Sequence, residues 1–154
     1  MSSLPEHTDE YFMQRALEQA FLAADLDEVP IGAVVVIDNE IIASAHNRRE
    51  TDCDPASHAE FLAIREASQK LERWRLSDAT VYVTLEPCPM CAGLMHQARI
   101  ARCVYGASDP KAGALGTLYD LHDDTRLNHQ FDVTGGVLAQ ESATILKNFF
   151  ANKR

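Results

Sequence analysis

Two short segments of the chain carry side chains that can bind a metal ion and move protons. The first is His58-Ala59-Glu60, and the second is Pro87-Cys88-Pro89-Met90-Cys91. Cysteine and histidine are preferred ligands of Zn²⁺, and residues three apart, such as Cys88 and Cys91, share one face of a helix. With His58 as third ligand, a tetrahedral zinc ion would keep one position for water, as catalytic zinc sites do.

Glu60 follows His58 by two residues, and this spacing makes a structural demand. On a regular helix the two side chains would point roughly 200° apart. Both can therefore face one site only if His58 occupies the non-helical cap or the first turn. In that arrangement we expect Glu60 to act as an acid and base near the metal, not as a ligand.

Three other interpretations of these residues stay open. A Cys-x-x-Cys pair at a helix start is also typical of thioredoxin-like redox sites. A purely structural zinc site would need a fourth protein ligand, which Cys53 or His46 could supply. A zinc-binding scaffold without catalysis would use the same ligands, and Glu60→Gln would distinguish it from an enzyme because a scaffold has no turnover to lose.

The elements that must position these residues alternate between helices and strands. Helical periodicity and β-branched apolar runs predict, in chain order, a helix at 8–24, strands at 31–37 and 40–45, a helix at 57–71, a strand at 80–85, a helix at 89–98, strands at 100–107 and 131–134, and a helix at 138–151. This order favours an α/β fold with a mixed, partly parallel sheet and helices on both faces. Sites in such sheets lie at the carboxyl ends of strands, beside helix N-termini.

Length and composition fit one domain over residues 1–154. The chain is 46% hydrophobic and 24% charged, close to the average of soluble globular proteins. It has no apolar run of about 18 residues, so we expect no membrane span. The N-terminal segment Met1–Glu6 lacks the pattern of a signal peptide. We therefore expect a cytoplasmic protein with reduced cysteines.

The net charge of −9, taken alone, argues against nucleic-acid binding. The acidic residues are unevenly distributed, however, since residues 1–86 hold 17 of the 23 acidic but only 7 of the 14 basic residues. An anionic partner is thus expected mainly on the C-terminal half. The basic residues that could contact phosphates are Arg48, Arg49, Arg99, Arg102, Lys111, Arg126, Lys147, Lys153 and Arg154.

The pattern His58-Ala59-Glu60 followed by Pro87-Cys88-x-x-Cys91 resembles the signature of the zinc-dependent nucleoside and nucleobase deaminases. Longer blocks are similar to the bacterial tRNA-specific adenosine deaminases: 28–34, 46–48, 78–95, 106–111 and 128–129. The resemblance runs from about Tyr11 to Phe150 and therefore covers nearly the whole chain.

This resemblance implies a three-layer α/β/α cytidine-deaminase-like fold with a mixed five-stranded sheet, and a homodimer. It implies hydrolytic deamination of adenosine to inosine at the wobble position (34) of tRNA anticodons, by a zinc-activated water with Glu60 as proton shuttle. One Zn²⁺ per subunit would be bound by His58, Cys88 and Cys91. The partner would be a tRNA anticodon stem-loop.

The same resemblance implies further contacts with the substrate. Asn47 would contact the extruded adenosine, and Asp109 would contact the sugar of the target nucleotide or its neighbour. The pocket walls would be Pro30, Leu85 and Ala107. The alternative function is deamination of free guanine, cytosine or a nucleotide, with the same metal site and Glu60 but a different pocket.

Overall fold

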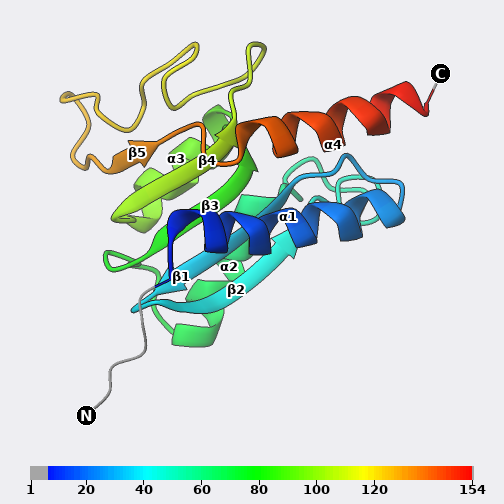
Figure 1. The fold of residues 1–154 in the computed structure, drawn as a ribbon. Helices are drawn as coiled ribbons and strands as arrows, with labels where there is room; N and C mark the ends of the chain where they lie inside the picture. The colour runs from blue at the N-terminus through cyan, green and yellow to red at the C-terminus, as the bar shows by residue number, and fades with distance from the viewer. Residues whose placement is uncertain (1–6, 154) are drawn as a thin grey trace.

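The computed structural model describes residues 7–153; Met1–Glu6, expected not to form a signal peptide, and Arg154 lie outside the described residues. The helices and strands follow in the order that the sequence predicts (Figure 1). Their bounds are α1 Asp9–Asp25, β1 Gly32–Ile37, β2 Glu40–His46, α2 Ala59–Leu71, β3 Thr80–Leu85, α3 Pro89–Ala98, β4 Arg102–Ala107, β5 Asp132–Thr134 and α4 Ala139–Ala151.

The five strands form one mixed sheet in the order β2-β1-β3-β4-β5. β1 is antiparallel to β2 and β3, whereas β3, β4 and β5 are parallel to one another. Helices α1 and α4 cover one face, and α2 and α3 cover the other (Figure 1). The three-layer α/β/α arrangement of the cytidine-deaminase-like fold is thereby confirmed.

Alternation along the strands supplies a core on each face of the sheet. Val35 and Val83 belong to the cluster beneath α2 and α3, whereas Val34, Tyr82 and Val104 pack with α1. All six residues of β1 are buried because this strand lies between β2 and β3 with helices above and below. Successive side chains in a strand point to opposite faces, so one apolar run serves both layers.

Gly32, the first residue of β1, allows α1 to pack directly on the sheet. A Cβ atom at this position would lie 2.0 Å from the carbonyl oxygen of Ala16 and 2.5 Å from the backbone nitrogen of Ala20. Only glycine fits so close to a helix backbone. This contact fixes the segment that joins α1 to β1, which borders the site described below.

A polar network joins the start of α1 to the middle of the sheet. The guanidinium of Arg102 donates two hydrogen bonds to the carboxylate of Asp9, at 3.0 and 2.8 Å, and a third to Thr134 Oγ1. The hydroxyl of Tyr82 donates to the same carboxylate at 2.8 Å. Hydrogen bonding by Arg102 holds the pKa of Asp9 below its ordinary value.

The fourth strand and the last helix begin later than their sequence patterns predict. Ile100 and Ala101 precede β4 because their backbone N–H groups donate to Met95 and Ala79, outside the ladder. Leu138 precedes α4 with a left-handed backbone. Within residues 7–153, no helix is both long enough and apolar enough to cross a membrane.

Candidate metal centre and adjoining cavity

Three possible metal ligands meet where two helices begin. The Nδ1 atom of His58 lies 3.7 Å from Sγ of Cys88 and 3.5 Å from Sγ of Cys91. These ligand atoms all lie within 4.8 Å of one another, and the group contains no fourth member among the described residues. Cys53 is exposed, and His46 Nδ1 faces the carbonyl of Asn47. The observed group therefore has the three protein ligands of a catalytic site, and a structural site with Cys53 or His46 is not formed.

The local backbone explains how these side chains converge. His58 and Cys88 are the N-cap residues of α2 and α3, and both have extended backbone angles. Pro89 occupies the first turn of α3, where its missing N–H group costs nothing. Helix N-termini carry partial positive charge, which favours a thiolate at Cys88.

The two cysteines differ in acidity. A hydrogen bond from Cys91 lowers the pKa of Cys88 to about 4, and the same bond raises the pKa of Cys91. The Cys88 thiolate in turn raises the pKa of His58. Two cysteine sulfur atoms with an imidazole nitrogen beside them form the donor set that suits Zn²⁺.

Glu60 lies in the first turn of α2 and is 4% exposed. Burial raises the pKa of this carboxyl to about 7. Because His58 is the cap and not a helical residue, both side chains line the same cavity. His58 is thus at the non-helical cap, one of the two positions that allow it to share a site with Glu60.

The cavity has a volume of about 210 Å³ and lies at the carboxyl end of β3. Of the expected substrate contacts, Asn47, Leu85 and Asp109 line it. Pro30 and Ala107 are buried but are not among its lining residues. The full lining is Val29, Ile31, Asn47, Arg49, His58, Ala59, Glu60, Leu85, Glu86, Cys88, Asp109 and Ala112.

The neighbours of Pro30 contribute the apolar wall that was expected from Pro30 itself. Val29 and Ile31 both line the cavity. Pro30 is the middle residue of a tight turn in which the N–H of Ile31 donates to the carbonyl of Val29 at 2.9 Å, and only its two neighbours reach the cavity. Ala107 instead accepts a hydrogen bond from the backbone N–H of Glu86 at 2.8 Å.

The two polar residues expected at the substrate are held by backbone hydrogen bonds. Asn47 is buried; its Nδ2 donates to the carbonyl of Val29 at 3.2 Å, and its Oδ1 accepts from the N–H of Arg49. Asp109 Oδ1 accepts from the backbone N–H groups of Lys111 and Ala112, at 2.9 and 3.2 Å. Both side chains are therefore oriented before any ligand binds.

Two buried glutamates at the loops around the cavity were not predicted from the sequence. Glu28 is 1% exposed and accepts hydrogen bonds from the N–H groups of Glu50 and Thr51 and from the Thr51 hydroxyl. Glu86 is 2% exposed and lines the cavity. Both glutamates stand directly beside apolar segments of the sequence. This position could have indicated their burial, and a buried carboxylate needs hydrogen-bond partners.

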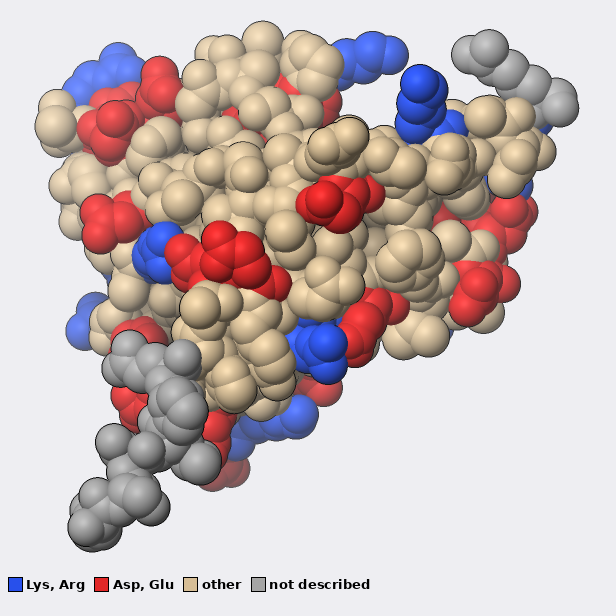
Figure 2. Space-filling view, viewed as in Figure 1, with Lys and Arg blue, Asp and Glu red and all other residues tan. Residues whose placement is uncertain are grey.

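Many of the basic residues proposed as phosphate contacts are already paired with carboxylates. Arg48, Arg102, Arg126 and Lys153 form ion pairs with Asp52, Asp9, Asp124 and Asp27. Within residues 7–153, no ion pair involves Arg49, Arg99, Lys111 or Lys147. On the face covered by α1 and α4, basic and acidic side chains are interspersed (Figure 2). That face offers no concentrated positive patch.

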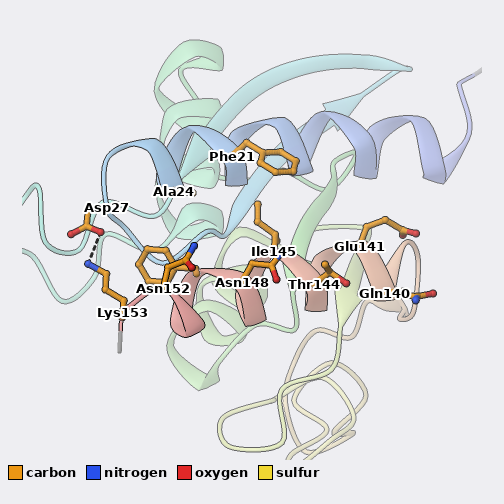
Figure 3. Close-up of a pocket in the computed structure, with 11 residues that line it drawn as sticks. Phe21, Ala24, Asp27, Gln140, Glu141, Thr144, Ile145, Asn148, Asn152 and Lys153 are labelled. Atoms are coloured by element: carbon orange, nitrogen blue, oxygen red, sulfur yellow. Dashed lines mark ion pairs between the residues drawn. The ribbon is translucent and has the colours of Figure 1, made fainter.

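A larger groove, of about 840 Å³, lies between α1 and α4. Phe21 of α1 and Ile145 of α4 face each other across it, and an Asp27–Lys153 ion pair lies at one end (Figure 3). None of the expected metal ligands or substrate contacts is among its lining residues. The chemistry is therefore expected at the smaller cavity.

Fold and site together define a hydrolytic deaminase with the cytidine-deaminase-like fold. A family model described as MafB19-like deaminase matches residues 7–154. A tRNA-specific adenosine deaminase of Bacillus subtilis is 51% identical over 146 residues, which is 95% of this chain and 91% of the relative. A protein of the same description from Haemophilus influenzae is 46% identical and covers 95% of this chain. The chain belongs to the tRNA-specific adenosine deaminase family.

Solved structures agree with this relationship. One, from a study of A-to-I editing by tRNA:A34 deaminases at the wobble position, is 46% identical with a TM-score of 0.85. The match covers 88% of this chain and 99% of that chain. A guanine deaminase of Bacillus subtilis is 37% identical with a TM-score of 0.65, over 72% of this chain and 71% of its own. Family membership excludes the thioredoxin-like interpretation of Cys88 and Cys91.

Proposed function

We propose that this chain hydrolyses adenosine to inosine at the wobble position (34) of a tRNA anticodon. The observation that carries the proposal is that the His58, Cys88 and Cys91 cluster adjoins a cavity that Glu60 also lines. This cavity belongs to a chain half identical to a tRNA-specific adenosine deaminase. Residues 1–154 act as one deaminase domain.

His58, Cys88 and Cys91 hold one Zn²⁺ ion per subunit. The donor set supports this assignment, because two sulfur atoms and an imidazole nitrogen lie within 4.8 Å of one another. Zn²⁺ held by these residues would supply a Lewis acid that activates water as a nucleophile.

Glu60 moves the protons of the reaction. Its carboxylate takes a proton from the attacking water, whose oxygen forms a bond to C6 of adenine, and delivers that proton to ring nitrogen N1. In the second half, Glu60 carries the remaining hydroxyl proton to the amino group, which leaves as ammonia. Adenosine and water thus yield inosine and ammonia, and Glu60 ends in its starting state.

Asn47, Leu85 and Asp109 bind the target nucleotide, and Pro30 and Ala107 support the pocket from behind. Asn47 contacts the base, and Asp109 contacts the sugar of the target nucleotide or its neighbour. The cavity lining and the hydrogen bonds that orient Asn47 and Asp109 support these roles. A base in an anticodon loop is unpaired, so its extrusion into the cavity costs little.

The partner is the anticodon stem-loop, and the chain works as a homodimer in the cytoplasm. Arg49 is the proposed phosphate contact, because it lines the cavity and, within residues 7–153, forms no ion pair. Deamination of a free base, as in guanine deaminase, is the alternative. The identity to tRNA-specific deaminases, 46–51%, favours the RNA substrate over the 37% to a guanine deaminase.

The proposal is tested on transcripts of one tRNA that differ only in where adenosine stands in the anticodon loop. Inosine is read as guanosine after reverse transcription and sequencing. We expect conversion at position 34 and none when the only loop adenosine is moved to position 35. Equal conversion at both positions, or none at either, would contradict the proposed function.

A further inference from the structure

The loop that carries Asp109 is built around one buried carboxylate. Glu86 is 2% exposed and stands between β3 and Cys88. Its Oε1 accepts from the backbone N–H of Asp109 at 3.1 Å and from the hydroxyl of Thr117. Its Oε2 accepts from the N–H groups of Leu115 and Thr117, each at 3.1 Å. Four donors from one loop therefore converge on a single side chain.

The loop wraps closely around this carboxylate. A Cβ atom at Gly113 would lie 2.4 Å from Cδ of Glu86, so only glycine lets the backbone pass there. The N–H of Gly113 donates to the carbonyl of Asp109 at 2.9 Å, and the N–H of Ala114 donates to Pro87. Backbone N–H groups that point inward form a concave anion-binding cradle, and here the anion is a side chain of the protein itself.

We propose that Glu86 is a positioning residue that sets the place of Asp109 at the substrate. This inference rests on the proposed function, in which Asp109 contacts the nucleotide sugar. Glu86 acts through the Asp109 N–H bond, and the Asp109 side chain is then oriented by Lys111 and Ala112. The metal ligand Cys88 and the substrate contact Asp109 are thereby tied to the same short segment after β3.

Glu86→Gln tests this role because it removes the hydrogen bond to the N–H of Asp109 with little change in side-chain shape. A glutamine side chain has nearly the same shape but replaces one acceptor oxygen by an NH₂ donor. If the NH₂ group replaced Oε2, it would face the N–H donors of Leu115 and Thr117. If it replaced Oε1, it would face only the N–H of Asp109, and the Thr117 hydroxyl could accept a hydrogen bond from it. The second orientation is therefore favoured. The variant therefore loses the link to Asp109 and keeps those to Leu115 and Thr117.

The kinetic test is a double-mutant cycle on the zinc-loaded full chain, with an anticodon stem-loop as substrate. We expect Glu86→Gln to raise KM on the order of 10-fold with kcat largely retained, because the sugar contact lies away from the reacting atom. In an Asp109→Ala background, Glu86→Gln should change KM less than about 3-fold. Effects of the two substitutions that multiply would show that Glu86 does not act through Asp109.

Thr117→Val is the matched control in this cycle. It removes the hydroxyl bond to Glu86 Oε1 but leaves all three backbone N–H donors, including that of Asp109. We expect its KM to stay within about twofold of wild type, and a KM as high as that of Glu86→Gln would overturn the assignment. Zinc content and the midpoint of thermal unfolding, measured on both variants, separate a local shift from general unfolding.

Amide hydrogen exchange decides the inference independently of activity. Glu86→Gln should accelerate deuterium uptake in residues 109–113, which lose their bond to the side chain, while Glu28→Gln, which loosens the loop at Glu50 and Thr51, should not. Unchanged exchange in residues 109–113 of Glu86→Gln would overturn the inference. A wild-type chain that leaves the stem-loop unreacted would instead contradict the proposed function, and the exchange result would still stand.

Discussion

His58 caps helix α2 while Glu60 lies in its first turn, and both side chains line one cavity. The extended backbone of His58 breaks the helical step that would otherwise turn the two side chains roughly 200° apart. His58 can therefore bind the metal while Glu60, two positions further on, transfers protons at the same site. This relationship connects the local fold of α2 to the proposed chemistry.

Replacing Cys91 by serine should remove the metal. Cys91 is fully buried beside His58, and serine is a poor ligand for zinc. We expect zinc by atomic absorption to fall to background, and the midpoint of thermal unfolding to fall by roughly 5–10 °C, since a ligand at ~100 times its Kd contributes about 2.7 kcal/mol. Cys53→Ser, at an exposed cysteine, should retain zinc; loss there would argue against the ligand assignment.

Replacing Glu60 by glutamine should abolish turnover while the metal stays bound. Glutamine keeps the shape of the side chain but cannot accept a proton from water. We expect kcat on an anticodon stem-loop to fall at least 10²–10⁴-fold, with unchanged zinc content. Glu66→Gln on the same helix, 42% exposed, should retain activity. A Glu60→Gln variant with near wild-type kcat would exclude the proton shuttle.

Replacing Asp9 by asparagine should destabilise the fold in a pH-dependent way. The pKa of Asp9 is lowered in the folded chain, so its ion pair stabilises above the ordinary carboxyl value of 3.8 and is lost as pH falls through the lower folded-state value. Urea unfolding at pH 7 should show a loss of about 1–2 kcal/mol. That difference should shrink below pH 3.8.

Asp78→Asn is the control for this pH dependence. Asp78 pairs with Arg73 at the surface, where ion pairs contribute about 0–1 kcal/mol. We expect a smaller loss of stability at pH 7 than for Asp9→Asn. A difference between wild type and Asp9→Asn that is the same at pH 7 and pH 3.5 would show that lost packing, not lost charge, explains the effect.

Replacing Gly32 by alanine should separate α1 from the sheet. The added methyl group would overlap the carbonyl of Ala16, which belongs to helix backbone and cannot rotate away. We expect a loss of at least about 3 kcal/mol in unfolding free energy, the upper end for an overpacked core. Gly93→Ala, where a Cβ meets nothing within 4 Å, should be neutral or stabilising. Equal stabilities of the two variants would refute the close approach.

The order of elements could be predicted because each strand and helix carries its own periodicity. The burial of β1 on both faces, for example, follows from its unbroken apolar run. Cys88 and Cys91 could be recognised from spacing and residue type alone. The place of His58 was predictable in part, because helix geometry allows it beside Glu60 only at the non-helical cap or in the first turn, and the structure has it at the cap.

The loops around the cavity could not be predicted in the same way. Glu86 binds partners 23–31 residues further along the chain, and no local pattern specifies such contacts. The choice of Val29 and Ile31 over Pro30 as cavity wall depends on how an irregular segment is rotated. Ion pairs such as Arg102 with Asp9 join distant residues, so a count of basic residues overstates those available to RNA.

The most direct test of the central claim compares three substrates in one assay. They are an anticodon stem-loop with adenosine at the wobble position, free adenosine, and free guanine, each incubated with zinc-loaded protein. We predict inosine in the stem-loop and no product from the free adenosine or guanine at the same enzyme concentration. Turnover of guanine with an unreacted stem-loop would contradict the account and would remove the substrate roles of Asn47 and Asp109.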